Sequence, residues 1–192
     1  MLKARTIFRQ FLKSPNKVGA VAPSSRYLAN AMLDQISWDT LTNVVEYGPG
    51  TGAISRHLLK RIEPHQRLFA VELNDQFIPV LQQKLPELEV FNESVSDIRA
   101  ICDREQVDVV DAIVSGLPWT AFPEPLQEEL MNATLSVLAD RGQFVTFAYV
   151  HGLPLQNAKR FRKRLKDTFS EVSISPVVWR NVPPAIFYSC RK

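Results

Sequence analysis

Three glycines at alternate positions follow an apolar run near the start of this chain. They are Gly48, Gly50 and Gly52 in the segment V-V-E-Y-G-P-G-T-G, residues 44–52. A residue without a Cβ atom lets a ligand approach the backbone and permits the positive φ values of a tight turn. A helix that begins near residue 53 would add free N–H groups at its start. The pattern predicts a cradle for an adenosine-containing cofactor, and Gly48, Gly50 and Ala53 also satisfy the dinucleotide fingerprint G-x-G-x-x-G/A.

Two carboxylates flank this loop in the sequence. Glu46 lies two residues before the first glycine, and Glu72 ends a second apolar run 20 residues after Gly52. A carboxylate is unfavourable beside a pyrophosphate and stabilising beside a cation. S-adenosylmethionine carries a sulfonium and an ammonium group and no phosphate, so Glu46 favours it, although pairing with a basic side chain or capping the turn is the alternative. Glu72 occupies the place from which a carboxylate holds ribose hydroxyls, and both kinds of cofactor would use it.

The block E-Y-G-P-G-T-G followed by A-V-E-L-N resembles motifs I and II of the class I S-adenosylmethionine-dependent methyltransferases. That resemblance implies that the glycine loop holds the methionine end of the cofactor and Glu72 the ribose. Members often carry G-D-A after the third strand, where this chain has N-E-S, so Glu93 corresponds by position to the adenine contact; a solvated loop glutamate is the alternative. The implied cofactor-binding residues are Glu46, Tyr47, Gly48, Gly50, Thr51, Gly52, Glu72, Leu73, Glu93, Ser94 and Ser115.

The segment S-G-L-P-W, residues 115–119, follows the fourth expected strand, at the edge where open α/β folds bind ligands. It resembles the N-L-P-Y motif of the rRNA adenine dimethyltransferases, in which the asparagine accepts a hydrogen bond from the target amino group. Gly116 stands at that asparagine position. A planar exocyclic amine needs such an acceptor, whereas an alkyl amine needs only deprotonation and in-line positioning, so we expect an aliphatic substrate. Trp119 beside Pro118 could offer its face to an ammonium group; the alternatives are a hydrophobic anchor for Trp119 and a strand-end hydroxyl bonded to backbone for Ser115.

Short apolar runs alternate with helical patterns, which predicts a parallel sheet flanked by helices. We expect strands at 43–47, 67–72, 89–92, 107–115 and 142–150, and helices at 53–61, 76–85, 95–104, 125–138 and 154–168. Two further strands are expected at 171–178 and 185–190, a terminal pair that resembles the class I methyltransferases. The expected fold is α/β and Rossmann-like, with a mostly parallel seven-stranded sheet, helices on both faces and a terminal antiparallel strand.

Composition limits the alternatives. A chain of 192 residues with 45% hydrophobic content is long enough for one globular domain with a substantial core. Cys102 and Cys190 form no C-x-x-C pair and there is no histidine cluster, so we expect neither a disulfide framework nor a metal site. No apolar run reaches the roughly 18 residues of a membrane span, and no signal sequence is recognisable. We therefore expect a cytoplasmic location.

The net charge of +3 is unevenly distributed. Residues 1–33 contain six basic residues and no acidic one, while the rest of the chain has 17 basic and 20 acidic residues. On a helix over residues 3–13, Ile7, Phe8, Phe11 and Leu12 share one face, and the other carries Lys3, Arg9, Gln10 and Lys13. Such helices lie in the headgroup plane of anionic membranes; packing or dimerisation and RNA binding are the alternatives. We expect an arm and substrate-side helix at 1–36 and a methyltransferase domain at 37–192.

The phrase F-L-K-S-P-N-K-V-G-A-V-A-P-S-S-R-Y-L-A, with the glycine loop, S-G-L-P-W and R-N-V-P-P-A-I-F-Y, resembles the soluble bacterial phospholipid N-methyltransferases over nearly the full chain. The resemblance implies methyl transfer from S-adenosylmethionine to the amine of phosphatidylethanolamine and its methylated intermediates, towards phosphatidylcholine, with S-adenosylhomocysteine as the product. The expected partner is an anionic phospholipid surface at the inner face of the cytoplasmic membrane, with no nucleic acid and no metal.

In this interpretation the lipid headgroup enters between the turn after Pro23 and the 115–119 edge. The expected substrate-binding residues are Ser24, Ser25, Tyr27, Trp119 and Arg180, and the expected catalytic residues are Tyr27, Ser115, Gly116, Pro118 and Trp119. Either serine could instead cap a helix at 26–33, and Arg180 could be solvated. A water, the lipid phosphate or Tyr27 could accept the proton. The competing functions are a nucleobase or RNA adenine methyltransferase, a small-molecule amine methyltransferase, a membrane-binding module without activity and a NAD-dependent dehydrogenase.

Overall fold

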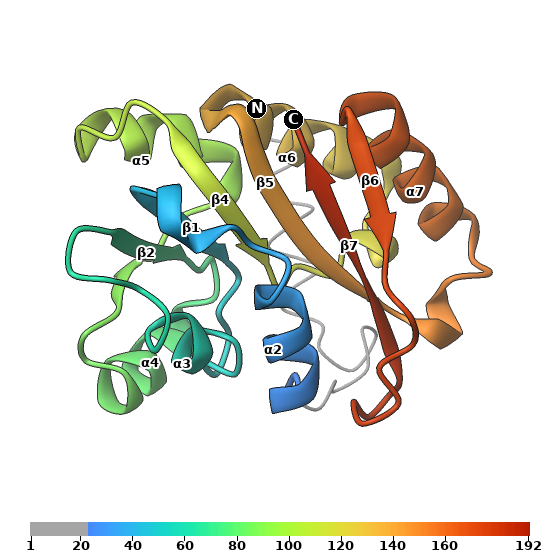
Figure 1. The fold of residues 1–192 in the computed structure, drawn as a ribbon, viewed down its shortest axis with the longest axis horizontal. Helices are drawn as coiled ribbons and strands as arrows, with labels where there is room; N and C mark the ends of the chain where they lie inside the picture. Colours follow the sequence, from blue (N-terminus) through green and yellow to red (C-terminus); the bar gives the residue numbers. More distant parts are fainter. Residues whose placement is uncertain (1–22) are drawn as a thin grey trace.

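A seven-stranded sheet forms the centre of the protein (Figure 1). The computed structural model describes residues 23–192. The strand order is β3-β2-β1-β4-β5-β7-β6. The strands are β1 (Asn43–Tyr47), β2 (Arg67–Val71), β3 (Glu89–Phe91), β4 (Val110–Ser115), β5 (Leu138–Tyr149), β6 (Glu171–Ile174) and β7 (Ala185–Arg191).

Strand direction confirms the expected topology. Strands β1 to β5 pair in parallel. Strand β7 lies between β5 and β6 and runs antiparallel to both. The carboxyl ends of β1 to β5 therefore lie along one edge of the sheet, where ligands bind in open α/β folds.

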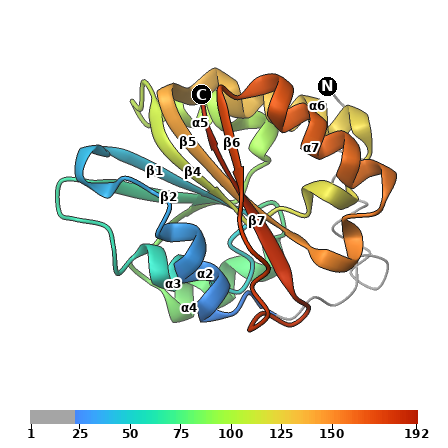
Figure 2. The same ribbon diagram turned by 45° about the vertical axis from the view of Figure 1, so that its right-hand side comes forward.

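Helices cover both faces of the sheet, as Figures 1 and 2 show. Helices α2 (Arg26–Leu33), α3 (Ser55–Leu58) and α4 (Ile78–Lys84) pack on one face; α5 (Ile98–Arg104), α6 (Glu124–Val137) and α7 (Gln156–Thr168) pack on the other. Within residues 23–192, short 3-10 helices connect these elements: η1 (Trp38–Thr40), η2 (Asp75–Phe77), η3 (Val95–Asp97), η4 (Trp119–Ala121) and η5 (Val150–Gly152).

The alternation of side chains along each strand builds two hydrophobic cores. On β1, Val45 and Tyr47 enter the core beneath α5, α6 and α7, whereas Val44 enters the core beneath α2, α3 and α4. Successive residues of a strand point to opposite faces, so Glu46 shares the side of Val44. A sheet buried on both faces explains why its strands are nearly continuous apolar runs.

Several element boundaries differ from the expected ones, and proline accounts for two of the differences. The strand expected at 171–178 ends at Ile174, and Val178 forms only an isolated bridge with Ala185. Pro176 lies between them and has no N–H to donate to the ladder. The helix expected at 76–85 starts with the turn η2, and Pro79 lies in the first turn of α4. The helix expected at 53–61 is shorter, at Ser55–Leu58.

Strand β5 is longer than expected. It begins at Leu138, directly after α6, instead of at residue 142. No helix within residues 23–192 is long and apolar enough to cross a membrane. The amphipathic helix expected at 3–13 lies outside the described residues and stays a prediction.

Candidate active site

The glycine loop has the backbone conformation that its sequence predicts. The φ angles of Gly48, Gly50 and Gly52 are 65°, 55° and 80°, in the left-handed region that favours glycine. Gly48 and Gly50 line a cavity of about 370 Å³. Gly52 faces α4 instead, since an added Cβ atom would lie 2.8 Å from Cδ1 of Leu85. Thr51 belongs to the same loop but does not line this cavity.

The cavity lies at the carboxyl ends of β1 to β5, and its lining is mostly apolar. It brings together residues from five connections that are distant in the sequence. The residues that the sequence assigned to the site and that line the cavity are Gly48, Gly50, Glu72, Leu73, Glu93, Gly116 and Pro118.

Glu72 connects two of these loops at the floor of the cavity. Its Oε2 accepts a hydrogen bond from the Gly50 amide at 3.0 Å, and its Oε1 accepts one from the Asn74 amide at 2.8 Å. Burial raises its pKa, and these amides oppose the rise. A carboxylate held in this way keeps acceptor capacity, since each oxygen has two lone pairs.

Glu46 lies next to the loop, on the α3 side of β1. It is 1% exposed. Its Oε2 has no hydrogen-bond partner among the described residues, and neither has the Ser55 hydroxyl. Burial raises the pKa of Glu46 to about 8; Ser55 opposes this rise, and Glu72 adds to it. An unpartnered buried carboxyl is costly unless a ligand completes the site.

Three residues that the sequence assigned to the site lie in the core. The Trp119 ring is fully buried and stacks on Phe161 of α7 at 5.2 Å between centroids. Its Nε1 donates to Ser115 Oγ at 2.8 Å, so both groups already have a partner. Tyr47 is fully buried on the same face of the sheet, and burial raises its pKa. Trp119 is therefore the hydrophobic anchor that the sequence left as its alternative, and its ring offers no face to a substrate.

Gly116 is in close contact with the glycine loop. Its amide donates to the Tyr47 carbonyl at 2.8 Å. A Cβ atom at position 116 would lie 2.7 Å from the Gly48 carbonyl oxygen, closer than real Cβ contacts allow. The close packing of the end of β4 against the glycine loop therefore disfavours an asparagine side chain at position 116.

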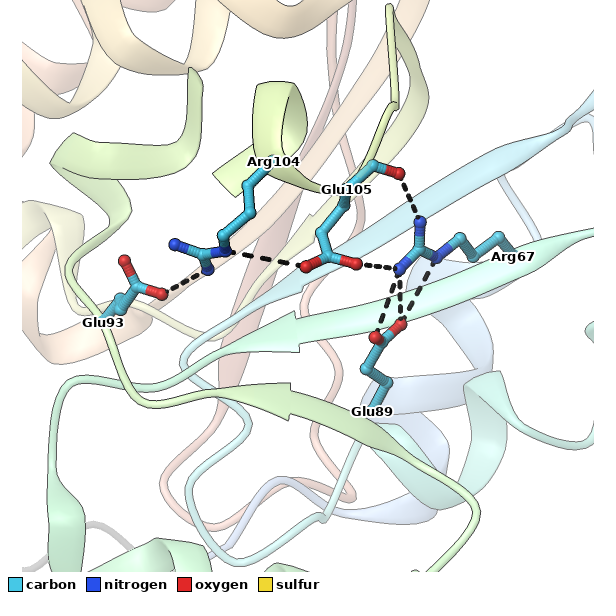
Figure 3. Close-up of polar contacts among 5 residues, drawn as sticks. All are labelled: Arg67, Glu89, Glu93, Arg104 and Glu105. Carbon is cyan, nitrogen blue, oxygen red and sulfur yellow. Dashed lines mark hydrogen bonds and ion pairs between the residues drawn. The ribbon is translucent and has the colours of Figure 1, made fainter. Parts of the chain in front are cut away.

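Glu93 reaches the cavity from the end of β3 and is held by Arg104. The Arg104 Nη2 lies 2.6 Å from Glu93 Oε1, and its Nε lies 3.6 Å from Glu105 Oε1. Figure 3 shows this row continuing through Arg67 to Glu89. Ser94 is buried, and its Oγ accepts from the Ser96 amide and hydroxyl, so it caps η3.

The residues around the start of α2 form a separate group. The Ser25 hydroxyl accepts from the Leu28 amide, as the capping alternative predicted. The guanidinium groups of Arg26 and Arg180 lie 4.9 Å and 4.8 Å from the centre of the Tyr27 ring. A hydrogen bond from Arg26 lowers the pKa of Tyr27. Ser24, Ser25, Tyr27 and Arg180 do not line the cavity.

The sequence did not single out the residues at the end of β5. Phe147, Tyr149 and His151 line the cavity opposite the glycine loop. The Tyr149 and His151 rings are stacked at 5.7 Å with an angle of 11°. The segment F-A-Y-V-H carries a signal that could have found them, because its aromatic residues end a strand at the carboxyl edge of the sheet.

Sequence comparison identifies the family of this fold and site. No family model matches the sequence. The chain is 32% identical to the ornithine lipid N-methyltransferase of Singulisphaera acidiphila over 185 residues, which cover 95% of this chain and 92% of that protein. The chain belongs to the family of this lipid N-methyltransferase. It is a class I S-adenosylmethionine-dependent methyltransferase.

Other proteins match only part of this chain, or match its fold at low sequence identity. The ribosomal RNA small subunit methyltransferase A of Clostridium botulinum is 33% identical over 78 residues, 40% of this chain and 27% of that protein. Among solved structures, the O-methyltransferase TomG of Streptomyces achromogenes with S-adenosylmethionine has a TM-score of 0.68 at 18% identity, over 99% of this chain and 88% of that one. Human methyltransferase-like protein 13 with S-adenosylhomocysteine has a TM-score of 0.63 at 16% identity, over 85% and 78%. These two likenesses show the fold.

The residues at the cavity fit the cofactor of the methyltransferase, S-adenosylmethionine. The positive-φ glycines provide a surface of backbone without side chains, and a Cβ at Gly50 would meet no atom within 4 Å. Glu72 has acceptor capacity for hydroxyl groups. Glu46 does not itself line the cavity, but it lies on β1 directly before the loop, and its unpartnered oxygen suits a cation. No cluster of three or more His, Cys, Asp or Glu side chains that could bind a metal ion occurs within residues 23–192.

Proposed function

We propose that this methyltransferase transfers methyl groups to the amine of phosphatidylethanolamine and its methylated intermediates, towards phosphatidylcholine, at a membrane surface. The observation that carries the proposal is the contact between Gly116 and the loop. With 2.7 Å between a Cβ at 116 and the Gly48 carbonyl oxygen, that position has no room for the acceptor that a planar nucleobase amine needs. An alkyl amine keeps its lone pair localised once it is deprotonated, so it needs no such acceptor.

The relative supports a lipid as the carrier of that amine. The alignment with the ornithine lipid N-methyltransferase covers 95% of this chain, whereas the alignment with the ribosomal RNA methyltransferase covers 40%. The mostly apolar lining of the cavity also suits an alkyl amine better than a polar base edge.

Bound S-adenosylmethionine supplies a methyl group that its sulfonium already activates. We assign Gly48 and Gly50 to the methionine end, Glu72 to the ribose, and Glu93 with the Ser94 backbone to the adenine. Glu46 and Thr51 would complete the methionine side. The apolar lining around Leu117 and Phe147 excludes water, so the residues contribute mainly positioning and desolvation of the amine.

The incoming ammonium group must lose a proton before its nitrogen can attack. The titratable side chains that line the cavity are Glu72, Glu93, Tyr149 and His151. Glu72 is bonded to backbone amides, Glu93 is paired with Arg104, and burial raises the pKa of Tyr149 to about 12. His151 is the remaining titratable side chain of this set, and imidazole is the side chain that exchanges protons most readily near neutral pH. We assign the proton to His151.

Ornithine lipid is the second candidate substrate, because the relative with nearly full coverage carries that activity in its name. Its headgroup also presents an alkyl amine, so the same cavity and the same proton acceptor would serve it.

Methyl transfer from radiolabelled S-adenosylmethionine tests the proposal. We would offer the full chain vesicles of phosphatidylethanolamine, vesicles with ornithine lipid, and ribosomal RNA at equal amine concentration. Label in the lipid fraction, with successive methyl additions by mass spectrometry, is the expected outcome. A Glu72→Gln variant serves as the control for cofactor dependence. Label in RNA with none in either lipid would overturn the proposal.

A further inference from the structure

Five large hydrophobic side chains are exposed in the described part of this methyltransferase, and four of them lie towards the carboxyl edge of the sheet. The five are Tyr27, Val109, Leu155, Trp179 and Val182. Trp179 and Val182 are each 73% exposed, which is unusual for side chains of this kind in one short connection. Only Val109, which precedes β4, belongs to the amino edge of the sheet.

The connection that carries Trp179 and Val182 adjoins the end of β5. Ala185 pairs with Tyr149, and the Val150 amide donates to the Pro184 carbonyl at 2.9 Å. The Ser25 amide donates to Asn181 Oδ1 at 2.8 Å, which ties the start of α2 to the same connection. Figures 1 and 2 show the β6–β7 connection beside the first turn of α2. Since Tyr149 lines the cavity, this connection lies next to the cavity wall.

The same surface is basic. Arg26 and Arg180 both lie over the Tyr27 ring, and neither has an ion pair with a carboxylate within residues 23–192. Residues 23–33 and 172–192 contain no aspartate or glutamate. Two guanidinium groups held on one ring without counter-charges form a site for anions such as phosphate.

We infer that the surface formed by Arg26, Tyr27, Trp179, Arg180 and Val182 docks on an anionic lipid bilayer. Tryptophan has an apolar ring with a polar N–H and favours the level of the lipid headgroups. Val182 enters beside it, while the two arginines bind lipid phosphates, each basic group contributing about 1 kcal/mol near an anionic surface. The inference rests on the proposed function, since docking here places the cavity opening against the lipid that is to be methylated.

Vesicle sedimentation with the full chain tests this surface. We would compare vesicles of phosphatidylcholine with vesicles that contain phosphatidylglycerol, using a Trp179→Ser, Val182→Ser double variant. The matched control is Val109→Ser, which removes an exposed valine from the opposite edge. We expect the double variant to bind anionic vesicles at least about tenfold more weakly and the control to bind like the parent. An Arg26→Gln, Arg180→Gln variant should lose most of the preference for anionic vesicles.

A second measurement reports the contact between Trp179 and the lipid directly, even if other segments of the chain also contribute to vesicle binding. Trp38 and Trp119 are not among the exposed hydrophobic residues, so Trp179 should be the tryptophan that acyl-chain bromine atoms quench. Quenching by brominated vesicles should disappear in Trp179→Phe. Unchanged quenching in that variant, together with unchanged vesicle binding by the double variant, would overturn the docking surface.

The design separates this inference from the proposed function. The double variant should keep the parent affinity for S-adenosylhomocysteine and methylate short-chain lipid in solution, yet lose activity on vesicles. If the parent docks through Trp179 but methylates no lipid in either form, the docking surface stands and the proposed function fails. If the variant methylates vesicle lipid as fast as the parent, the function stands and the docking surface is overturned.

Discussion

Glu46 is a buried carboxyl that costs the fold stability unless a ligand completes its surroundings. The carboxyl is buried beside Ser55, and its Oε2 is unpartnered among the described residues. Its pKa is raised from 4.5 to about 8 by burial, so near neutral pH the protein without ligand holds it mostly protonated. A cation from the cofactor would favour the charged form.

The pH dependence of stability follows from this shift. Between pH 4.5 and about 8 the unfolded chain loses the Glu46 proton while the folded chain keeps it, so stability falls as pH rises through this window. The loss from this group is at most on the order of 5 kcal/mol. We expect Glu46→Gln to remove much of this fall and to be more stable than the parent at pH 8. Urea unfolding of the parent and of Glu46→Gln at pH 5 and pH 8 measures the two free energies of unfolding. An equal loss of stability between these pH values in both proteins would contradict the assignment of the pH dependence to Glu46. Calorimetry of the parent and of Glu46→Gln tests whether the Glu46 carboxylate contributes to the binding of S-adenosylhomocysteine.

Gly116 and Gly152 offer a matched pair of glycines, because both line the cavity. A Cβ at Gly116 would lie 2.7 Å from backbone, whereas one at Gly152 would have Thr120 Oγ1 at 3.9 Å as its nearest neighbour. We expect Gly116→Ala to cost about 1–3 kcal/mol of stability, as overpacking does, and to weaken cofactor binding by displacing the loop. Gly152→Ala should leave both nearly unchanged. Equal effects of the two substitutions in thermal unfolding and cofactor titration would show that the close contact is unimportant.

His151 is tested by the shape of a pH–rate profile. If it accepts the ammonium proton, His151→Gln should lower kcat by about 10²-fold or more and change the shape of the pH–rate profile. The KM for lipid should change little, because Tyr149 and Phe147 still line the cavity. A profile with the parent shape and only a smaller amplitude would assign His151 a positioning role.

At the scale of elements, the sequence predicted what local pattern determines. The apolar runs and the glycine loop are local features, and the structure confirms the strands and the positive φ angles that they predict. Glu72 lies directly after β2, and its role towards the ribose stays a prediction. Trp119 depends on a distant element, because Phe161 of α7 covers its ring. The sequence around residues 115–119 gives no sign of this contact with Phe161. It therefore could not decide whether the Trp119 ring faces a ligand or packs in the hydrophobic core. Phe147 and His151 differ from Trp119, because the aromatic residues that end β5 are a local signal at the carboxyl edge, although only the fold shows that they line the same cavity as the glycine loop.

The connection from β4 to α6 provides a test at this scale. As a core anchor, Trp119 should cost about 3–5 kcal/mol on truncation to Ala. Trp119→Phe keeps an aromatic ring and should cost less, mainly through loss of the hydrogen bond to Ser115 Oγ. We expect the KM of Trp119→Phe for the amine to match that of the parent. A higher KM with unchanged unfolding free energy would instead restore a role in ammonium binding.

At the scale of the whole molecule, the carboxyl edge concentrates function. The cavity lies there, and the connection that carries Trp179 adjoins Tyr149 at the end of β5, which lines the cavity. The order β3-β2-β1-β4-β5-β7-β6 produces this arrangement, because the antiparallel β7 returns the chain past the end of β5. The basic helix expected at residues 3–13 lies outside the described residues and stays a prediction.

Ligand-induced stabilisation distinguishes this methyltransferase from a dehydrogenase of similar outline. A ligand present at 100 times its Kd stabilises the folded state by about 2.7 kcal/mol, which for a chain of this size raises Tm by about 5–10 °C. We expect S-adenosylhomocysteine to produce this shift and NAD to produce none. Glu72→Gln should reduce the shift strongly, because it disturbs the bonds to Gly50 and Asn74. The control Glu87→Gln changes an exposed glutamate and should retain it. A shift with NAD, or an undiminished shift in Glu72→Gln, would refute the assignment of this cavity to the methyl donor.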